Sequence, residues 1–75
     1  MPHPAMQDWP AILGKNVGRL RRQKGLTQEE LAFEAKIDLT YMGGIERGER
    51  NPSLFVMARI ADALSVPLTK LLSGT

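Results

Sequence analysis

The stretch "TQEELAFEAKIDLTYMGGIERG", residues 27–48, contains two short helical patterns joined by a very short link. The first pattern opens with a capping box, in which the oxygen of Thr27 caps the new helix and the side chain of Glu30 reaches back to the cap. The link falls around residues 36–38, which leaves room for little more than a turn. The stretch therefore predicts two short helices that meet at a tight turn.

The second helix of this stretch, predicted over residues 39–47, contains two adjacent glycines, Gly43 and Gly44, in its middle. Each glycine lowers helix stability by roughly 0.8–1 kcal/mol relative to alanine. The apolar side chains of Met42 and Ile45 mark the side of the helix that enters the core. The glycines lie on the opposite side, so the loss of helix stability has to serve something other than core packing.

Helical spacing of apolar residues predicts three more helices around this stretch. Leu13, Val17 and Leu20 form the inner side of a first helix, which Gly25 can end. The inward residues expected after the cap Ser53 are Leu54, Met57, Ile60, Ala61 and Leu64 in a fourth helix, then Leu68, Leu71 and Leu72 in a final short helix. No segment alternates as a half-buried strand does, so the predicted fold class is all-α, a compact domain of five short helices.

The composition indicates one small domain that needs neither a metal nor a cofactor. A chain of 75 residues is near the lower size limit for a self-sufficient core, and this one has no cysteine. Its single histidine, His3, has no second imidazole with which to share a metal. Without a cysteine nucleophile, a usable histidine base or a phosphate-binding glycine loop, the chain is not expected to be an enzyme.

The sequence contains neither a membrane-spanning pattern nor the pattern of a signal peptide. No run approaches the roughly 18 apolar residues of a membrane span, so no membrane partner is expected. The leader "MPHPAMQDWP" lacks the basic and apolar regions of a signal peptide, which predicts a cytoplasmic protein. We expect residues 1–9 to be a flexible leader and residues 10–75 to form the domain.

Charge is distributed unevenly along the chain, although the net charge is only +2. The segment between Trp9 and Gln28 contains no acid and five basic residues, namely Lys15, Arg19, Arg21, Arg22 and Lys24. An unbalanced basic block on a small domain favours a polyanionic partner, with a merely solvated basic face as the alternative.

Two short helices with a tight link in a domain of this kind indicate a helix-turn-helix. Three segments, "LRRQKGLTQEELAFEA" at 20–35, "TYMGGIERGERNPSL" at 40–54 and "IADALSVPLTKLL" at 60–72, together resemble the Cro/C1-type (XRE-like) helix-turn-helix family. The resemblance runs from about residue 13 to residue 72 and implies a five-helix, lambda-repressor-like domain that binds DNA. The compact size is most similar to the controller proteins of restriction–modification systems.

The resemblance implies a transcriptional regulator that binds a specific double-stranded DNA operator as a homodimer. Its location would be cytoplasmic, on the nucleoid when bound to DNA, and RNA polymerase would be a further partner of an activator. The alternatives are a protein-interaction module that has kept the fold, or an antitoxin that binds both DNA and a toxin.

Arg21 and Glu46 are predicted to form a structural ion pair. On helical wheels, each lies only about 70–80° from the apolar stripe of its own helix. Opposite charges next to the same core should pair, because an unpaired buried charge is expensive. The resemblance implies the same pair, which links the first helix to the recognition helix.

The outer side of the third helix, with Thr40, Gly43, Gly44 and Arg47, is the side that enters the major groove in a helix-turn-helix. The glycines would let the helix backbone approach the base edges, with close packing against another protein helix as the alternative. Leu39 stands where relatives often have arginine or glutamine. It cannot bond to a base edge, but it can contact a thymine methyl, as can Thr40. Some specificity is therefore expected from DNA shape.

Phosphate contacts are predicted around this helix. Gln28 lies in the first turn of the second helix, where free amides and the helix dipole favour an anion. The resemblance places it on the DNA backbone or an adjacent base. Tyr41, Arg47, Arg50 and Asn51 flank the outer side and the following loop, in reach of phosphate oxygens. Arg47 or Arg50 would also supply a guanine contact from the helix end.

Two further pairs of residues depart from the family pattern. Phe55 and Val56 are apolar where relatives commonly have polar residues, so they are predicted to form the homodimer contact. Lys36 and Ser65 stand at helix ends where glycine is common. Each must accept a left-handed conformation or end its helix differently.

Overall fold

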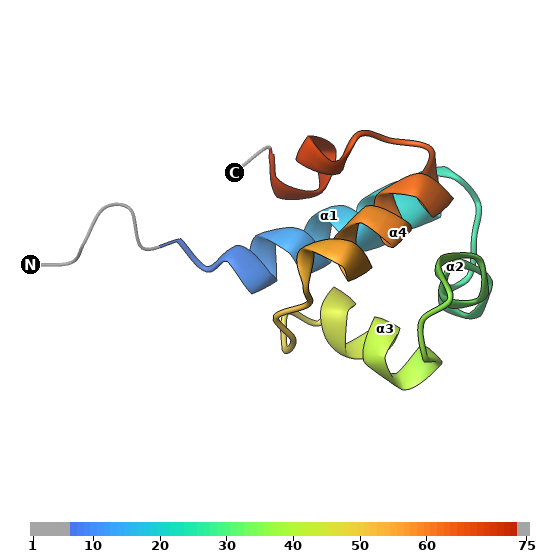
Figure 1. Cartoon of the computed structure of the whole chain (residues 1–75), viewed down its shortest axis with the longest axis horizontal. Coiled ribbons are helices and arrows are strands. Elements are labelled where there is room, and N and C mark those ends of the chain that lie inside the picture. The colour runs from blue at the N-terminus through green and yellow to red at the C-terminus, as the bar shows by residue number, and fades with distance from the viewer. Residues whose placement is uncertain (1–6, 74–75) are drawn as a thin grey trace, which may run out of the picture.

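The computed structural model describes residues 7–73, and these form a wholly helical domain (Figure 1). Its elements are α1 (Trp9–Gln23), α2 (Gln28–Ala35), α3 (Leu39–Glu46), α4 (Leu54–Leu64) and a 3-10 helix, η1 (Leu68–Leu72). The described residues contain no strand, which confirms the all-α prediction. None of their helices has the length and apolar character needed to span a bilayer.

The count of five α-helices was wrong, because the last element is a 3-10 helix. Five residues are too few for more than one or two α-type hydrogen bonds, and short segments of this kind commonly form the tighter i to i+3 bonds. The bond from the amide of Lys70 to the carbonyl oxygen of Pro67, 2.9 Å long, has this spacing. The 3-10 helix still carries Leu71 into the core, where it is fully buried.

Local signals set the helix boundaries. Asp8 caps α1 through its carboxylate, which accepts a bond from the amide of Ala11, so α1 includes Trp9, the last residue of the expected leader. Residues 1–6 of that leader lie outside the described part of the chain. Both bonds of the predicted capping box between Thr27 and Glu30 are present.

Left-handed residues end or follow all four α-helices, and Gly48, with φ of 77°, follows α3. Gly25, with φ of 78°, follows α1 as predicted. Lys36 and Ser65, both with φ of 58°, end α2 and α4 in the same region of backbone space, although neither is glycine. The amide two residues beyond the last helical residue then bonds back into the helix, as from Ile37 to the carbonyl of Ala32.

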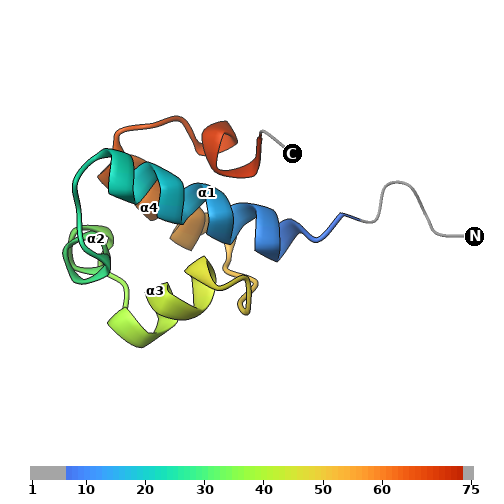
Figure 2. The ribbon, with the colours of Figure 1, turned by 180° about the vertical axis from the view of Figure 1, so that it is seen from behind.

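α1 and α4 pack against each other at the centre of the domain, with η1 on one side, α3 on the other and α2 at one end (Figures 1 and 2). The core consists of Leu13, Val17, Leu20, Leu31, Ala32, Ala35, Met42, Ile45, Ile60, Ala61, Leu64 and Leu71. Leu54, expected to point inward, is instead 63% exposed. A helical wheel gives the direction of a side chain but not the reach of the neighbouring helices, which leave Leu54 at the start of α4 largely uncovered.

Two contacts of α1 that were not predicted position the other elements. Gly14 lies against the end of α3, so closely that a Cβ there would be 2.7 Å from the carbonyl oxygen of Glu46. Asn16, the buried polar residue of this core, donates both amide hydrogens to the carbonyls of Leu71 and Ser73, at 2.8 Å each. α1 is therefore the frame on which both α3 and the C-terminal segment are held.

Candidate nucleic-acid interface

α3 forms one edge of the domain and follows α2 after a tight turn (Figures 1 and 2). Its inner side chains, Met42 and Ile45, are fully buried, as predicted. Asp38 caps its start by accepting a hydrogen bond from the amide of Tyr41. The buried side anchors the helix, and the opposite side is left for a partner.

Glu46, at the end of α3, joins three helices through its carboxylate. Arg21 of α1 donates to it from Nε at 2.7 Å and from Nη2 at 3.1 Å. Gln28 of α2 donates to it from Nε2 at 3.0 Å. The side chains of Arg21 and Glu46 are only 13% and 8% exposed, and Arg21 also donates to the carbonyl of Leu26. These contacts hold α3 against both α1 and α2.

The structure thus brings Arg21 and Glu46 together, as predicted, and it adds Gln28, for which only a contact with DNA was predicted. Gln28 is the first residue of α2, whereas Glu46 is the last residue of α3. The contact depends on how α2 crosses α3, which no pattern within either helix reports.

Gly43 and Gly44 are covered by arginine side chains. A Cβ on Gly43 would lie 3.1 Å from Nη1 of Arg47 and 3.6 Å from Oε1 of Gln28. A Cβ on Gly44 would lie 2.9 Å from Cγ of Arg50 and 3.0 Å from its Nε. The two glycines are buried, and the arginines that cover them are exposed. The space that the glycines leave is therefore occupied by cationic side chains of the same chain.

The two arginines are held differently. The guanidinium carbon of Arg50 lies 5.6 Å from the centre of the Tyr41 ring, a distance suited to a cation–π contact. Arg47 donates from Nε to Oε1 of Glu49 at 3.1 Å, and both side chains of this pair are 59% exposed. Arg50 is thus directed toward the start of α3, while Arg47 lies over its middle.

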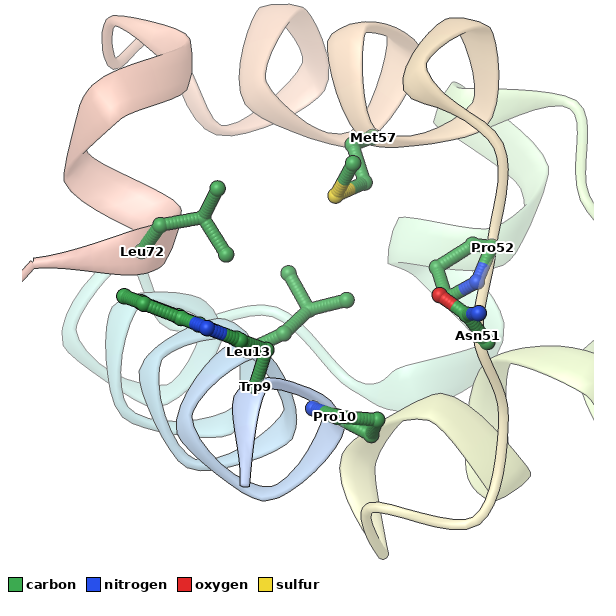
Figure 3. A pocket seen from close by; sticks show the side chains of 7 residues that line it. All are labelled: Trp9, Pro10, Leu13, Asn51, Pro52, Met57 and Leu72. Carbon is green, nitrogen blue, oxygen red and sulfur yellow. The ribbon is translucent and has the colours of Figure 1, made fainter. Parts of the chain in front are cut away.

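Leu39 and Thr40 are exposed at the start of α3, where Leu39 has 45% of its surface accessible. Asn51 is also exposed, but it lies in the loop after α3 and lines an apolar cavity of about 310 Å³ (Figure 3). The remaining lining residues are Trp9, Pro10, Leu13, Pro52, Met57 and Leu72. Asn51 therefore borders an apolar cavity as well as solvent.

The predicted dimer residues Phe55 and Val56 differ in their exposure. Phe55 is 81% exposed, whereas Val56 packs against the core. Leu54, beside Phe55, is exposed as well. The apolar surface at the start of α4 therefore consists of Leu54 and Phe55.

Basic residues remain available outside α3. Arg21 is used in the internal ion pair, while Lys15, Arg19, Arg22 and Lys24 are all exposed on or just after α1. Over residues 7–73, no three His, Cys, Asp or Glu side chains gather at a position that could hold a metal ion.

Residues 17–71 match the helix-turn-helix family profile. The HTH-type transcriptional regulator y4dJ of Sinorhizobium fredii is 40% identical over 68 residues, which span 91% of this chain and 88% of that protein. The control protein C.BamHI of Bacillus amyloliquefaciens is 42% identical over 65 residues, 85% of this chain and 80% of that one. The crystal structure of the restriction-modification controller protein C.AhdI from Aeromonas hydrophila is similar with a TM-score of 0.81 at 42% identity, covering 83% of this chain and 94% of C.AhdI.

Proposed function

The chain belongs to the Cro/C1-type helix-turn-helix family of DNA-binding transcriptional regulators, and we propose that it binds its operator as a homodimer with α3 in the major groove. The observation that carries the proposal is the two-sided character of α3. Its apolar side is fully buried, while its outer side bears the exposed Thr40 and is covered by Arg47 and Arg50, which follow the helix. A helix built in this way can present its outer side to a polyanion without disturbing the core.

The base contacts in this proposal come from the outer side of α3. Leu39 and Thr40 would each contact a thymine methyl group, because their exposed apolar atoms suit that partner. Gly43 and Gly44 add no side-chain atoms of their own, so what the DNA meets there is set by the arginines that cover them. The rest of the sequence preference would come from the shape and deformability of the DNA.

The phosphate contacts would come from the residues around α3. Arg50, stacked against Tyr41, and Asn51 in the following loop would contact one strand of the backbone. Gln28 would contact the backbone at the start of α2, where free amide groups favour an anion. Because one amide hydrogen of Gln28 is donated to Glu46, the contact would use its other hydrogen or the main chain.

The ion pair between Arg21 and Glu46 has a structural role in this proposal. Both side chains are buried and bonded to each other, so neither is free to contact DNA. Their role is to hold α3 at a fixed angle to α1, which fixes the direction in which the outer side of α3 faces.

The homodimer would form through the start of α4, where Phe55 and Leu54 are exposed next to each other. A two-fold axis there would pair the same apolar surface on both copies. The two recognition helices would then read half-sites about one helical turn, roughly 34 Å, apart.

Selection from a pool of random DNA duplexes tests the proposal. We expect the full chain to enrich a sequence with two related half-sites, and sedimentation on that duplex to give two chains per DNA. A protein-interaction module would enrich no sequence, and an antitoxin would enrich one but also require a protein partner. Transcription assays on the selected site, with RNA polymerase present, would separate activation from repression.

A further inference from the structure

Arg47 folds back from the end of α3 over Gly43, in the middle of the helix. A Cβ on Gly43 would lie 3.1 Å from Nη1 of Arg47, so the guanidinium occupies the position that a side chain would otherwise fill. Long side chains in helices point back over the preceding turn, which explains why residue 47 covers residue 43. The cationic group is thus presented from the centre of the recognition helix.

We infer that Arg47 reads a guanine in the operator, and that Gly43 makes this contact possible by leaving room for the guanidinium. The inference rests on the proposed function and deepens it, because it assigns base specificity to one side chain. Arginine bonds to guanine through two parallel N–H donors that meet O6 and N7 in the major groove. The contact therefore depends on the direction of the guanidinium as well as on its charge.

The hydrogen bonds of Arg47 leave the required donors available. Its Nε donates to Glu49, which holds the plane of the group. Within the described residues, no acceptor is bonded to Nη1 or Nη2, so the end of the fork is free to make a two-bond contact. Glu49 thereby orients the side chain without using the atoms that a base would need.

Other candidate base readers on this surface are absent or engaged. No Asn, Gln, Arg or Lys stands between Leu39 and Glu46. Gln28 donates to Glu46, and the guanidinium of Arg50 is directed over Tyr41. Arg47 is the arginine that places a terminal donor, Nη1, over Gly43 in the middle of α3.

Residue 43 controls the position of this group. A contact of 3.1 Å between a Cβ and Nη1 is tighter than usual, so even alanine at 43 would push the guanidinium aside by a few tenths of an ångström. A larger side chain would displace it further. Since a two-bond contact is directional, such a shift should reduce the preference for guanine more than it reduces overall affinity.

Selection from random duplexes with the wild type, Arg47→Lys, Arg47→Ala and Gly43→Ser tests the inference. Arg47→Lys keeps the charge but lacks the planar fork. We expect it to lose roughly ten- to a hundredfold of preference at one G·C pair per half-site, while the salt dependence of binding stays the same. Gly43→Ser should weaken the preference at that same pair, and Arg47→Ala should abolish it.

Lys15→Ala, an exposed change on α1, is the control for a general loss of charge and should leave the base preference unchanged. If Arg47→Lys selects the wild-type sequence and Arg47→Ala weakens all duplexes equally, Arg47 contacts phosphate only and the inference is wrong, while the proposed function stands. If Gly43→Ser alters affinity but not the preference at the pair read by Arg47, the assigned role of Gly43 is wrong. A wild type that enriches no duplex overturns the proposed function together with the inference.

Discussion

Gly14 of α1 lies against the main chain of Glu46 at the end of α3, with room for a hydrogen but not for a methyl group. A Cβ at this position would come within 2.7 Å of the carbonyl oxygen of Glu46 and would also meet the carbonyl oxygen of Ile45. Both obstacles are backbone atoms, so they cannot move aside as the end of a flexible side chain would. This contact sets the separation between α1 and the recognition helix.

Gly14→Ala should destabilise the fold by about 1–3 kcal/mol through overpacking, despite the better helix propensity of alanine. Gly18→Ala, on the same helix, is the matched control. Its Cβ would meet no backbone atom, only Nη1 of the exposed Arg22 at 3.1 Å, which can move, and Oε1 of Glu46 at 3.3 Å, so its loss should be smaller. Chemical denaturation of both variants measures the difference, and equal stabilities would show that α1 and α3 can separate easily.

Arg21→Ala or Glu46→Ala should lower the free energy of unfolding by about 3–5 kcal/mol, because the surviving charge is left buried without its partner. Arg19→Ala and Arg50→Ala, which remove exposed arginines, are the controls and should change stability little. Thermal melts of the four variants provide the measurement. Similar melting temperatures for all four would mean that the ion pair does not hold α3 in place.

Lys36→Gly and Ser65→Gly should each stabilise the protein. A left-handed residue with a Cβ costs about 1–2 kcal/mol, and the larger chain entropy of glycine offsets roughly 0.5–1 kcal/mol of that gain. Both residues have φ of 58°, so the net gain should be up to about 1 kcal/mol. Alanine at the same positions keeps the strain and should give no such gain in denaturation experiments.

Asn16→Ala should lower stability by about 1–3 kcal/mol, because the carbonyls of Leu71 and Ser73 lose their shared donor. Asn16→Asp has the same shape but no donor, and it turns a charge toward two carbonyl oxygens, so its loss should be larger. Hydrogen exchange of the amides of η1 would show where the structure opens. Unchanged exchange there in both variants would mean that other contacts hold the C-terminal segment.

Phe55→Ala should weaken the homodimer by at least about tenfold, since each copy loses a large aromatic contact at a two-fold interface. Phe33→Ala is the matched control, because Phe33 on α2 is 82% exposed against 81% for Phe55. Sedimentation over a range of concentrations compares the two variants with the wild type. A monomeric wild type, both free and on operator DNA, would show that the start of α4 is not a dimer interface.

Much of the fold follows from residues close together in the chain. The capping box of Thr27 and Glu30, the cap at Ser53 and the apolar spacing of Met42 and Ile45 each act within one or two helical turns, so the pattern of residues reports them directly. The angular position of Arg21 and Glu46 on their helices is local in the same sense. It places both charges beside the core, and the structure brings them to within 2.7 Å of each other.

Other features depend on how far apart the packed helices lie and where they end. Leu54 has the direction of a core residue, but its side chain is left largely exposed, whereas Val56 in the same turn packs against the core. The final element is a 3-10 helix because a segment this short commonly forms i to i+3 hydrogen bonds, as from Lys70 to Pro67. In this conformation Leu71 is still buried in the core. Neither outcome is contained in the spacing of apolar residues along one helix.

The sequence alone was enough for the order of the helical segments, the caps at Thr27 and Ser53 and the family of the chain, because these depend on local bonds and short motifs. The packing of distant segments settled the rest. The role of Gly14 depends on α3, whose main chain packs against it. Gly43 and Gly44 were predicted to leave an open surface, but in the folded chain Arg47 and Arg50 cover them. A glycine leaves space, and what fills that space is decided by the neighbouring chain.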